Sequence, residues 1–230
     1  MQVNEAIILA GGLGTRLRSA VPDLPKCMAP VQGKPFIAFV IDHLRQQGID
    51  HFIFSLGYRS EAFLDFLSGY LQPSDYQLVV ENEPLGTGGA IRYACTFARG
   101  ENVAALNGDS IFKISIEELI SLHTQKNADC TLALKPMQHI DRYGVVLLNA
   151  DNSIAAFEEK RFYERGYING GFYILNRESF LAESLPEKNS FETDYLQALH
   201  KQRKMYGLPQ DAYFIDIGIP EDYQKAQTEL

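Results

Sequence analysis

The first half of the chain alternates between short apolar runs and longer segments with apolar residues at helical spacing. Four apolar runs predict buried strands, at residues 3–9, 51–56, 77–80 and 102–106. Three segments between them predict helices, at residues 34–47, 60–70 and 88–98. Alternating strands and helices with short connections indicate a mostly parallel sheet flanked by helices, a Rossmann-like α/β fold.

The pattern changes in the second half. Ser115 and Glu118 have the spacing of a capping box, which predicts a helix over residues 116–123, and a strand is expected at 128–135. Three strands separated by polar turns, which we expect to be antiparallel, follow at residues 145–148, 154–157 and 167–175. Ser190 is the expected cap of a helix at residues 191–200. Residues 213–215 predict a short strand, and Pro220 is expected to open the last helix. No linker or repeat is visible, so residues 1–230 are expected to form one domain.

Ligands of such sheets bind beyond the carboxyl ends of the parallel strands. The loops expected at those ends are residues 10–16, 57–59, 81–89 and 107–110. The first follows a buried strand and places Gly11, Gly12 and Gly14 before Arg16. Bare backbone N–H groups and a planar guanidinium together suit phosphate oxygens, although a tight turn alone would also explain the glycines. The spacing matches neither a P-loop nor a dinucleotide fingerprint.

Three further charged residues follow restricted or strand-ending segments. Lys26 stands between Pro25 and Pro30, and a solvated lysine needs no such restricted backbone. Asp109 follows one apolar strand and Asp216 another; each alone is compatible with a turn aspartate. Two carboxylates together with phosphate oxygens and waters are a ligand set that suits Mg²⁺.

Residues 9–17 (LAGGLGTRL) and 25–30 (PKCMAP) together resemble the two-part signature of sugar-1-phosphate nucleotidyltransferases. Residues 83–90 (EPLGTGGA), 141–144 (DRYG), 157–160 (FEEK) and 213–218 (YFIDIG) extend the resemblance over essentially the whole chain. It is nearest to bacterial D-glycero-D-manno-heptose 1-phosphate guanylyltransferases. The resemblance implies transfer from GTP to the heptose 1-phosphate, giving GDP-heptose and pyrophosphate, with Mg²⁺ as cofactor.

The resemblance also implies roles for individual residues. It assigns catalysis to Arg16, Lys26 and Asp109, and the metal to Asp109 and Asp216. It divides the domain into a nucleotide-binding half, about residues 1–110, and a sugar-phosphate-binding half, about 111–230. The nucleotide-binding residues are expected to be Leu9, Gly11, Gly12, Gly14, Thr15, Tyr58, Glu81, Gly86, Thr87 and Asn107. The sugar-phosphate-binding residues are expected to be Gly144, Glu159, Lys160, Asn169, Gly170 and Glu192.

Some of these assignments have competing interpretations. Glu81 is the candidate acceptor for the donor edge of guanine, and Tyr58 would line the same pocket or pack on the edge of the domain. Glu192 also suits the first turn of a helix, where the dipole favours an acid. Arg161 stands where the family often has proline, so the loop after Lys160 departs from the family pattern.

The composition limits the kinds of molecule that the protein is expected to bind and the compartment in which it is expected to work. A net charge of −8 argues against a nucleic-acid partner, and it means that phosphate binding needs a local cluster of cations and amides. Three cysteines without metal spacing indicate reduced thiols in a cytoplasmic protein. No secretory signal or membrane-spanning stretch is visible, and the five histidines share no ligand spacing.

Several alternatives stay open from the sequence. Mannose 1-phosphate or another hexose phosphate with GTP is the second substrate pair, and uridylyl or thymidylyl transfer to a hexose 1-phosphate is the third. A catalytically silent regulatory homologue that binds nucleotide sugars would be free to lose one of the charged residues, and none is lost. A glycosyltransferase usually has an Asp-x-Asp motif, which residues 107–109 (NGD) do not form. Homo-oligomer formation is compatible with the sequence and is not decided by it.

Overall fold

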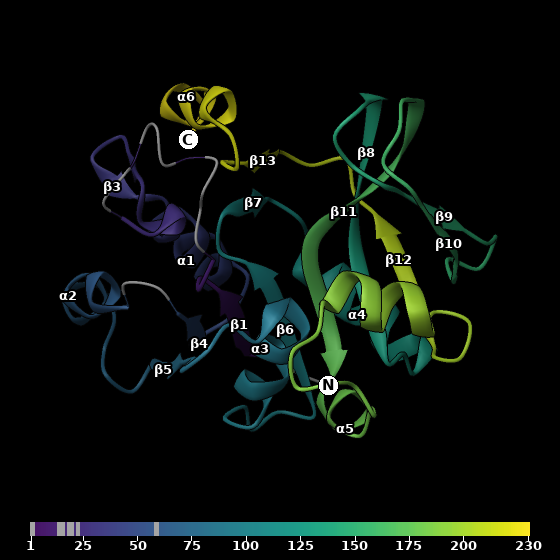
Figure 1. Ribbon diagram of the computed structural model, residues 1–230, viewed down its shortest axis with the longest axis horizontal. Helices are drawn as coiled ribbons and strands as arrows, with labels where there is room; N and C mark the ends of the chain where they lie inside the picture. The colour runs from purple at the N-terminus through teal and green to yellow at the C-terminus, as the bar shows by residue number, and fades with distance from the viewer. Residues whose placement is uncertain (1–2, 13–16, 18–20, 22–23, 58–59) are drawn as a thin grey trace.

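The computed structural model describes residues 3–12, 17, 21, 24–57 and 60–230, and over these residues its main sheet has nine strands (Figure 1). Four parallel strands form one side of the sheet, and they lie in the order β6 (Asn102–Asn107), β1 (Glu5–Leu9), β4 (His51–Leu56) and β5 (Tyr76–Val80). This confirms the parallel half that the alternating pattern predicts.

The second half of the chain adds antiparallel strands to β6. The long strand β11 (Tyr163–Asn176) pairs with β6, and it also pairs with β8 (Cys130–Ile140) and β9 (Val145–Leu148). β10 (Ile154–Glu158) completes a hairpin with β9. The predicted antiparallel strands are therefore confirmed, with β8 and β11 longer than expected.

Three short strand pairings and one helix were not expected from the sequence. β12 (Met205–Pro209) lies parallel to β8, and β7 (Ser110–Phe112) pairs antiparallel with β13 (Phe214–Asp216). β2 (Pro30–Val31) pairs with β3 (Lys34–Pro35), which is why the helix predicted at residue 34 begins only after Pro35. A short helix, α5 (Arg177–Leu181), follows β11.

The other helices lie where the periodicity places them. They are α1 (Phe36–Gln46), α2 (Glu61–Tyr70), α3 (Gly86–Cys95), α4 (Ile116–Lys126), the π-helix η3 (Phe191–Gln197) and α6 (Pro220–Glu229). Two predicted caps are confirmed, because the Ser115 and Ser190 hydroxyls accept from the third following N–H groups. Among the described helices, none has the length and apolar content needed to cross a membrane.

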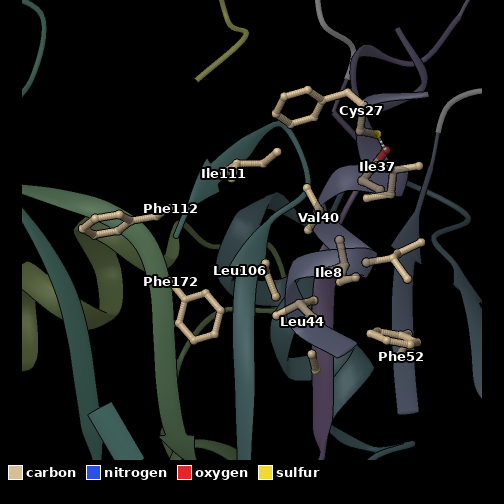
Figure 2. Packing of buried hydrophobic residues seen from close by; sticks show 14 of the residues in the cluster. Ile8, Cys27, Ile37, Val40, Leu44, Phe52, Leu106, Ile111, Phe112 and Phe172 are labelled. Atoms are coloured by element: carbon tan, nitrogen blue, oxygen red, sulfur yellow. Dashed lines mark hydrogen bonds between the residues drawn. The ribbon is translucent and has the colours of Figure 1, made fainter. Parts of the chain in front are cut away.

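The two faces of the sheet carry separate apolar cores because successive side chains of a strand point to opposite faces. Ile8 of β1 belongs to the core under α1, where it packs among Leu106, Val40 and Leu44 (Figure 2). Ile7, its neighbour in sequence, belongs to the opposite core with residues of α3 and η3. Helices thus hold both faces of the parallel strands, and the carboxyl ends of the strands are left for a site.

His123 joins α4 to the sheet. Its Nδ1 lies 2.9 Å from Thr131 Oγ1 of β8 and its Nε2 lies 3.0 Å from Asn102 Oδ1 of β6. A neutral ring with its proton on Nε2 satisfies both contacts, by donating to Asn102 and accepting from Thr131. Burial lowers the pKa of His123 from 6.5 to about 4, since a charged ring would lose its hydration there.

We therefore expect the free energy of unfolding to decrease as the pH falls from about 6.5 to about 4. In this range His123 binds a proton in the unfolded protein but not in the folded protein. Above pH 6.5 the ring is neutral in both states, and this contribution is lost progressively down to about pH 4, by about 3 kcal/mol in all. Urea unfolding at several pH values should show a shallower decline in a His123→Gln variant than in the wild type. Equal declines in the two proteins would contradict a neutral buried ring.

Candidate active site

Two backbone hydrogen bonds fix the position of Asp109. Gly108 N–H donates to the Leu9 carbonyl at 2.9 Å, so the turn after β6 is attached to the end of β1. Ile217 N–H donates to the Asp109 carbonyl at 3.1 Å, immediately beyond the β7–β13 pairing that sets Asp216 opposite Ser110. Asp109 and Asp216 are therefore neighbours, although they are far apart in sequence.

Lys26 reaches these carboxylates from a single 3-10 turn, η2 (Lys26–Met28), which Pro25 precedes. The turn is held to β1 by the neighbouring residue, because the buried Cys27 thiol donates to the Ala10 carbonyl at 3.8 Å (Figure 2). Burial, followed by the charge of Asp109, raises the pKa of the Cys27 thiol to about 12, so it stays neutral. Lys26 is thus placed by a rigid, partly buried segment, as its position between two prolines suggests.

The Lys26 ammonium lies between the two aspartates. Its Nζ donates to Asp109 Oδ2 at 2.5 Å and to Asp216 Oδ1 at 3.2 Å, and its side chain is 13% exposed. Asp216 Oδ1 also accepts Gly218 N–H at 2.7 Å, which fixes the carboxylate. A Cβ at Gly218 would lie 3.0 Å from Lys26 Nζ, so a larger residue there would crowd the ammonium.

This arrangement fits a divalent cation. Two carboxylates converge on one positive centre, and a single ammonium leaves one negative charge of the pair uncompensated. The carboxylates are about one third exposed, so ligands can reach them from the solvent side. Mg²⁺ prefers one or two protein carboxylates and fills its other positions with water and phosphate oxygens.

Lys26 and Asp109 line a cavity of about 310 Å³. Seven lining residues belong to the predicted site: Leu9, Gly12, Lys26, Thr87, Asn107, Asp109 and Glu192. Three others were not predicted, namely Ala10, Cys27 and Gly218. Ala10 and Cys27 adjoin predicted residues in the sequence, and Gly218 lies two residues after Asp216, so the predicted residues nearby were the available signal.

The nucleotide side of the predicted site is only partly described. Gly14, Thr15, Arg16 and Tyr58 lie outside the described residues. Gly11 faces the neighbouring loop closely, since a Cβ there would lie 3.0 Å from Gly57 N. This close approach of two backbones favours glycine whether or not a phosphate binds beside it.

Glu81 secures the loop that begins with it. Its Oε2 accepts Leu85 N–H at 2.9 Å, and its Oε1 accepts the Ser55 hydroxyl at 3.2 Å. Both oxygens therefore have a partner within the protein, and a carboxylate retains further lone pairs for a ligand. Recognition of guanine by Glu81 stays a prediction.

The glycines around Thr87 are needed for packing against another segment of the chain. A Cβ at Gly86, which has a φ of +73°, would lie 2.4 Å from the Asn189 carbonyl oxygen, and a Cβ at Gly88 would lie 1.8 Å from Asn189 Oδ1. At Gly89 a Cβ would lie 2.3 Å from the Glu187 carbonyl oxygen. The start of α3 therefore lies directly against residues 187–191, the segment that leads into η3.

Gly88→Ala is expected to destabilise the fold although alanine favours helices. The added methyl group would overpack the contact with Asn189, at a cost of about 1–3 kcal/mol that exceeds the gain in helix propensity. Gly69→Ala in α2 is the matched control, because a Cβ there meets nothing within 4 Å, and it should stabilise by up to about 1 kcal/mol. Urea unfolding of both variants measures the difference; a stabilised Gly88→Ala protein would contradict the contact.

The sugar side of the predicted site adjoins β11. Asn169 Nδ2 donates to the Tyr173 hydroxyl at 2.8 Å, and its Oδ1 accepts Gly171 N–H at 3.0 Å. A Cβ at Gly170 would lie 2.4 Å from a ring carbon of Phe112, which requires glycine for packing.

The segment with Glu159 and Lys160 begins one strand away from the same part of β11. Val145 of β9 pairs with both Glu158 and Ile168, so the end of β10 lies level with the residue before Asn169, with β9 between them. Gly144 packs against the Glu158 carbonyl, where a Cβ would lie at 2.7 Å. Glu159 and Lys160 are exposed, and among the described residues Lys160 has no ion pair. Arg161 donates to the Tyr163 hydroxyl at 2.9 Å.

A family model described as Nucleotidyl transferase matches residues 5–230. The chain belongs to the nucleotidyl transferase family. It is 49% identical to the D-glycero-alpha-D-manno-heptose 1-phosphate guanylyltransferase of Aneurinibacillus thermoaerophilus, over 98% of both chains. It is 43% identical to the protein of that name from Campylobacter jejuni, over 95% of this chain and 96% of the relative.

A solved structure of another protein has the same fold as this nucleotidyl transferase. HddC from Yersinia pseudotuberculosis, crystallised in complex with GMP-PN, superposes with a TM-score of 0.86 at 35% identity, covering 98% of each chain. The parallel strands with an added antiparallel half are therefore the architecture of a nucleotidyl transferase. The carboxyl-end cavity with Lys26, Asp109 and Asp216 beside it is the candidate active site of this one.

Proposed function

We propose that this nucleotidyl transferase transfers the guanylyl group of GTP to D-glycero-α-D-manno-heptose 1-phosphate, giving GDP-heptose and pyrophosphate. Two relatives with that name match nearly the full length of the chain at 49% and 43% identity. The observation that carries the chemistry is the convergence of Lys26, Asp109 and Asp216 beside the cavity at the carboxyl ends of the strands.

The reaction needs alignment and charge neutralisation more than proton transfer. An oxygen of the sugar phosphate attacks the α-phosphorus of GTP, and the bond to the departing pyrophosphate breaks in line with the attack. A phosphate monoester is anionic at neutral pH, so the nucleophile requires no general base. Phosphoryl transfers of this kind depend on positioning and electrostatic stabilisation, and a site with a fixed ammonium and two fixed carboxylates supplies both.

The described residues suggest a division of roles. Lys26 offsets the charge that develops at the α-phosphate, and Asp109 and Asp216 would hold Mg²⁺. A bound ion would stabilise negative charge on phosphate oxygens as a Lewis acid. Leu9, Gly11, Gly12 and Asn107, at the ends of β1 and β6, border the nucleotide. Gly14, Thr15 and Tyr58 keep the nucleotide-binding roles predicted for them, and Arg16 keeps its predicted catalytic role.

Residues of the second half provide the sugar side. Glu192 lines the cavity, and Asn169 lies on β11 two residues before Gly171, whose Cβ position borders Asn107. We assign contacts with the sugar 1-phosphate to Gly144, Glu159, Lys160, Asn169, Gly170 and Glu192. Lys160 is an exposed cation that would orient the phosphate of the sugar.

We also infer that the two halves work as one domain in the cytoplasm. Residues 187–191 of the second half pack on the start of α3 in the first half, and β11 pairs with β6. Cys27, Cys95 and Cys130 are free thiols buried in the protein, as suits a reducing compartment.

A pyrophosphate-release assay tests the proposed function. ATP, GTP, CTP, UTP and dTTP are each combined with D-glycero-α-D-manno-heptose 1-phosphate, mannose 1-phosphate or glucose 1-phosphate, with and without Mg²⁺. The expected result is Mg²⁺-dependent release that is fastest for GTP with the heptose 1-phosphate. Faster turnover of another pair would contradict the assigned substrates, and release without any sugar phosphate would indicate a hydrolase instead.

A further inference from the structure

One oxygen of the Glu192 carboxylate is held by two hydroxyl groups from different elements. Thr87 Oγ1 of α3 donates to Glu192 Oε2 at 2.6 Å, and Ser190 Oγ donates to the same atom at 3.0 Å. Thr87 Oγ1 in turn accepts Phe191 N–H at 2.9 Å. The Thr87 hydroxyl therefore donates its proton to Glu192, and it accepts a hydrogen bond from the backbone beside Glu192.

The other oxygen of Glu192 is left for a ligand. Within the described part of the chain, Glu192 Oε1 accepts no hydrogen bond, and Glu192 lines the cavity together with Lys26 and Asp109. A carboxylate with one oxygen fixed offers the second in a defined direction. Hydrogen bonds from hydroxyl groups to such a charged acceptor are short and strong, which suits a polyhydroxylated substrate.

We infer that Thr87 is a positioning residue for the sugar 1-phosphate: through its hydroxyl it aims the free oxygen of Glu192 at sugar hydroxyl groups. This inference rests on the proposed function, in which the cavity takes a sugar 1-phosphate. It differs from the nucleotide-binding role that the sequence predicts for Thr87, because the hydroxyl donor points to the sugar side of the cavity.

The surroundings of Thr87 hold this geometry. Asn189 N–H donates to the Leu85 carbonyl at 3.0 Å and Gly88 N–H donates to the Asn189 carbonyl at 3.0 Å, so the start of α3 and the segment before Glu192 form one unit. Thr87 and Glu192 therefore lie on backbones that cannot shift independently.

Tyr173 brings the predicted sugar contact Asn169 to the same place. Burial, followed by the negative charge of Glu192, raises the pKa of the Tyr173 hydroxyl well above its ordinary value. That hydroxyl accepts the Asn169 amide at 2.8 Å. The Tyr173 ring also packs against Phe191, the neighbour of Glu192, with centroids 4.8 Å apart, so Asn169 and Tyr173 lie near the Glu192 that Thr87 connects to α3.

The test compares Thr87→Val with Thr87→Ser in steady-state assays that vary each substrate separately. The substrate pair is the one that the wild type uses fastest in the pyrophosphate-release panel. Thr87→Val keeps the shape and removes the hydroxyl, so the KM for the sugar 1-phosphate should rise about tenfold, the loss that one hydrogen bond to a charged group represents. The KM for GTP should change by less than about twofold, and Thr87→Ser should restore the wild-type value.

Thr96→Val is the matched control, because the Thr96 hydroxyl donates to the Tyr93 carbonyl at the far end of α3. It should leave both KM values unchanged. A rise in the KM for GTP that equals or exceeds the rise for the sugar phosphate would overturn the inference, and so would an unchanged KM for the sugar phosphate. A wild type that uses none of the sugar phosphates would instead contradict the proposed function.

A double-mutant cycle separates positioning from a general effect on folding. If Thr87 acts through Glu192, Thr87→Val added to Glu192→Ala should raise the KM for the sugar phosphate by less than about twofold further. Independent effects, with the full tenfold rise in both backgrounds, would overturn the inference.

Discussion

Lys26→Met is expected to lower kcat by about 10²–10³, the usual effect of removing one charged group aimed at a transition state. Methionine keeps most of the length and apolar body of lysine, and it removes the ammonium that lies between Asp109 and Asp216. The same variant should bind Mn²⁺ more tightly in the absence of nucleotide, because the ammonium no longer competes for the two carboxylates. Steady-state kinetics and calorimetric titration with Mn²⁺ measure the two effects.

Lys34→Met is the matched control for Lys26→Met. Lys34 is an exposed lysine in β3, in the same part of the chain, and its loss should leave kcat and Mn²⁺ affinity unchanged. Near-normal turnover by a folded Lys26→Met protein would remove Lys26 from the chemistry. Weaker Mn²⁺ binding in that variant would contradict the inference that the ammonium and the metal occupy the same region.

Asp109→Asn is expected to abolish Mg²⁺-dependent pyrophosphate release while the thermal unfolding temperature stays close to the wild-type value. Asparagine has nearly the same shape, and the contact that fixes this turn uses the Asp109 backbone carbonyl, which accepts Ile217 N–H. The change therefore removes a metal ligand and a negative charge without removing the backbone support. Asp216→Asn is a less clean test, since the Asp216 carboxylate also accepts Gly218 N–H.

Asp211→Asn provides the comparison for Asp109→Asn. The Asp211 carboxylate also pairs with a lysine, Lys135, but it is 81% exposed, so its removal should change neither activity nor stability appreciably. An Asp109→Asn protein that retains Mg²⁺-dependent turnover would contradict the metal role. A variant that unfolds at much lower temperature would show instead that the aspartate mainly stabilises the turn.

The residues with the clearest chemistry were predictable from the sequence because each stands at the end of a predicted strand or on a restricted turn. Lys26, Asp109 and Asp216 belong to three separate motifs, and the parallel sheet is what brings the ends of β1 and β6 together. The motifs name the residues, but the sequence alone does not show that the ammonium would lie between both carboxylates. That depends on the β7–β13 pairing, which involves strands of three residues each.

The glycines near Thr87 show why other parts of the site were not predictable. A glycine in a ligand-binding motif and a glycine against another segment look the same in sequence, and the segment that restricts Gly86 and Gly88 is residues 187–191. The strand β12 was not predicted, for a related reason. Gly207 and Pro209 lower its intrinsic strand propensity, and it forms a strand because it lies along β8, where a Cβ at Gly207 would meet Leu134 at 2.5 Å.

The position of a bound metal would show whether Lys26, Asp109 and Asp216 form the reaction centre. Crystals grown with Mn²⁺ and a non-hydrolysable GTP analogue would locate the ion by its anomalous scattering. We expect one peak within ligand distance of both Asp109 and Asp216, next to the phosphates, with the Lys26 ammonium moved from between the carboxylates toward the α-phosphate. An ion bound to the phosphates but away from both aspartates, with the Lys26 pairs intact, would contradict this reaction centre.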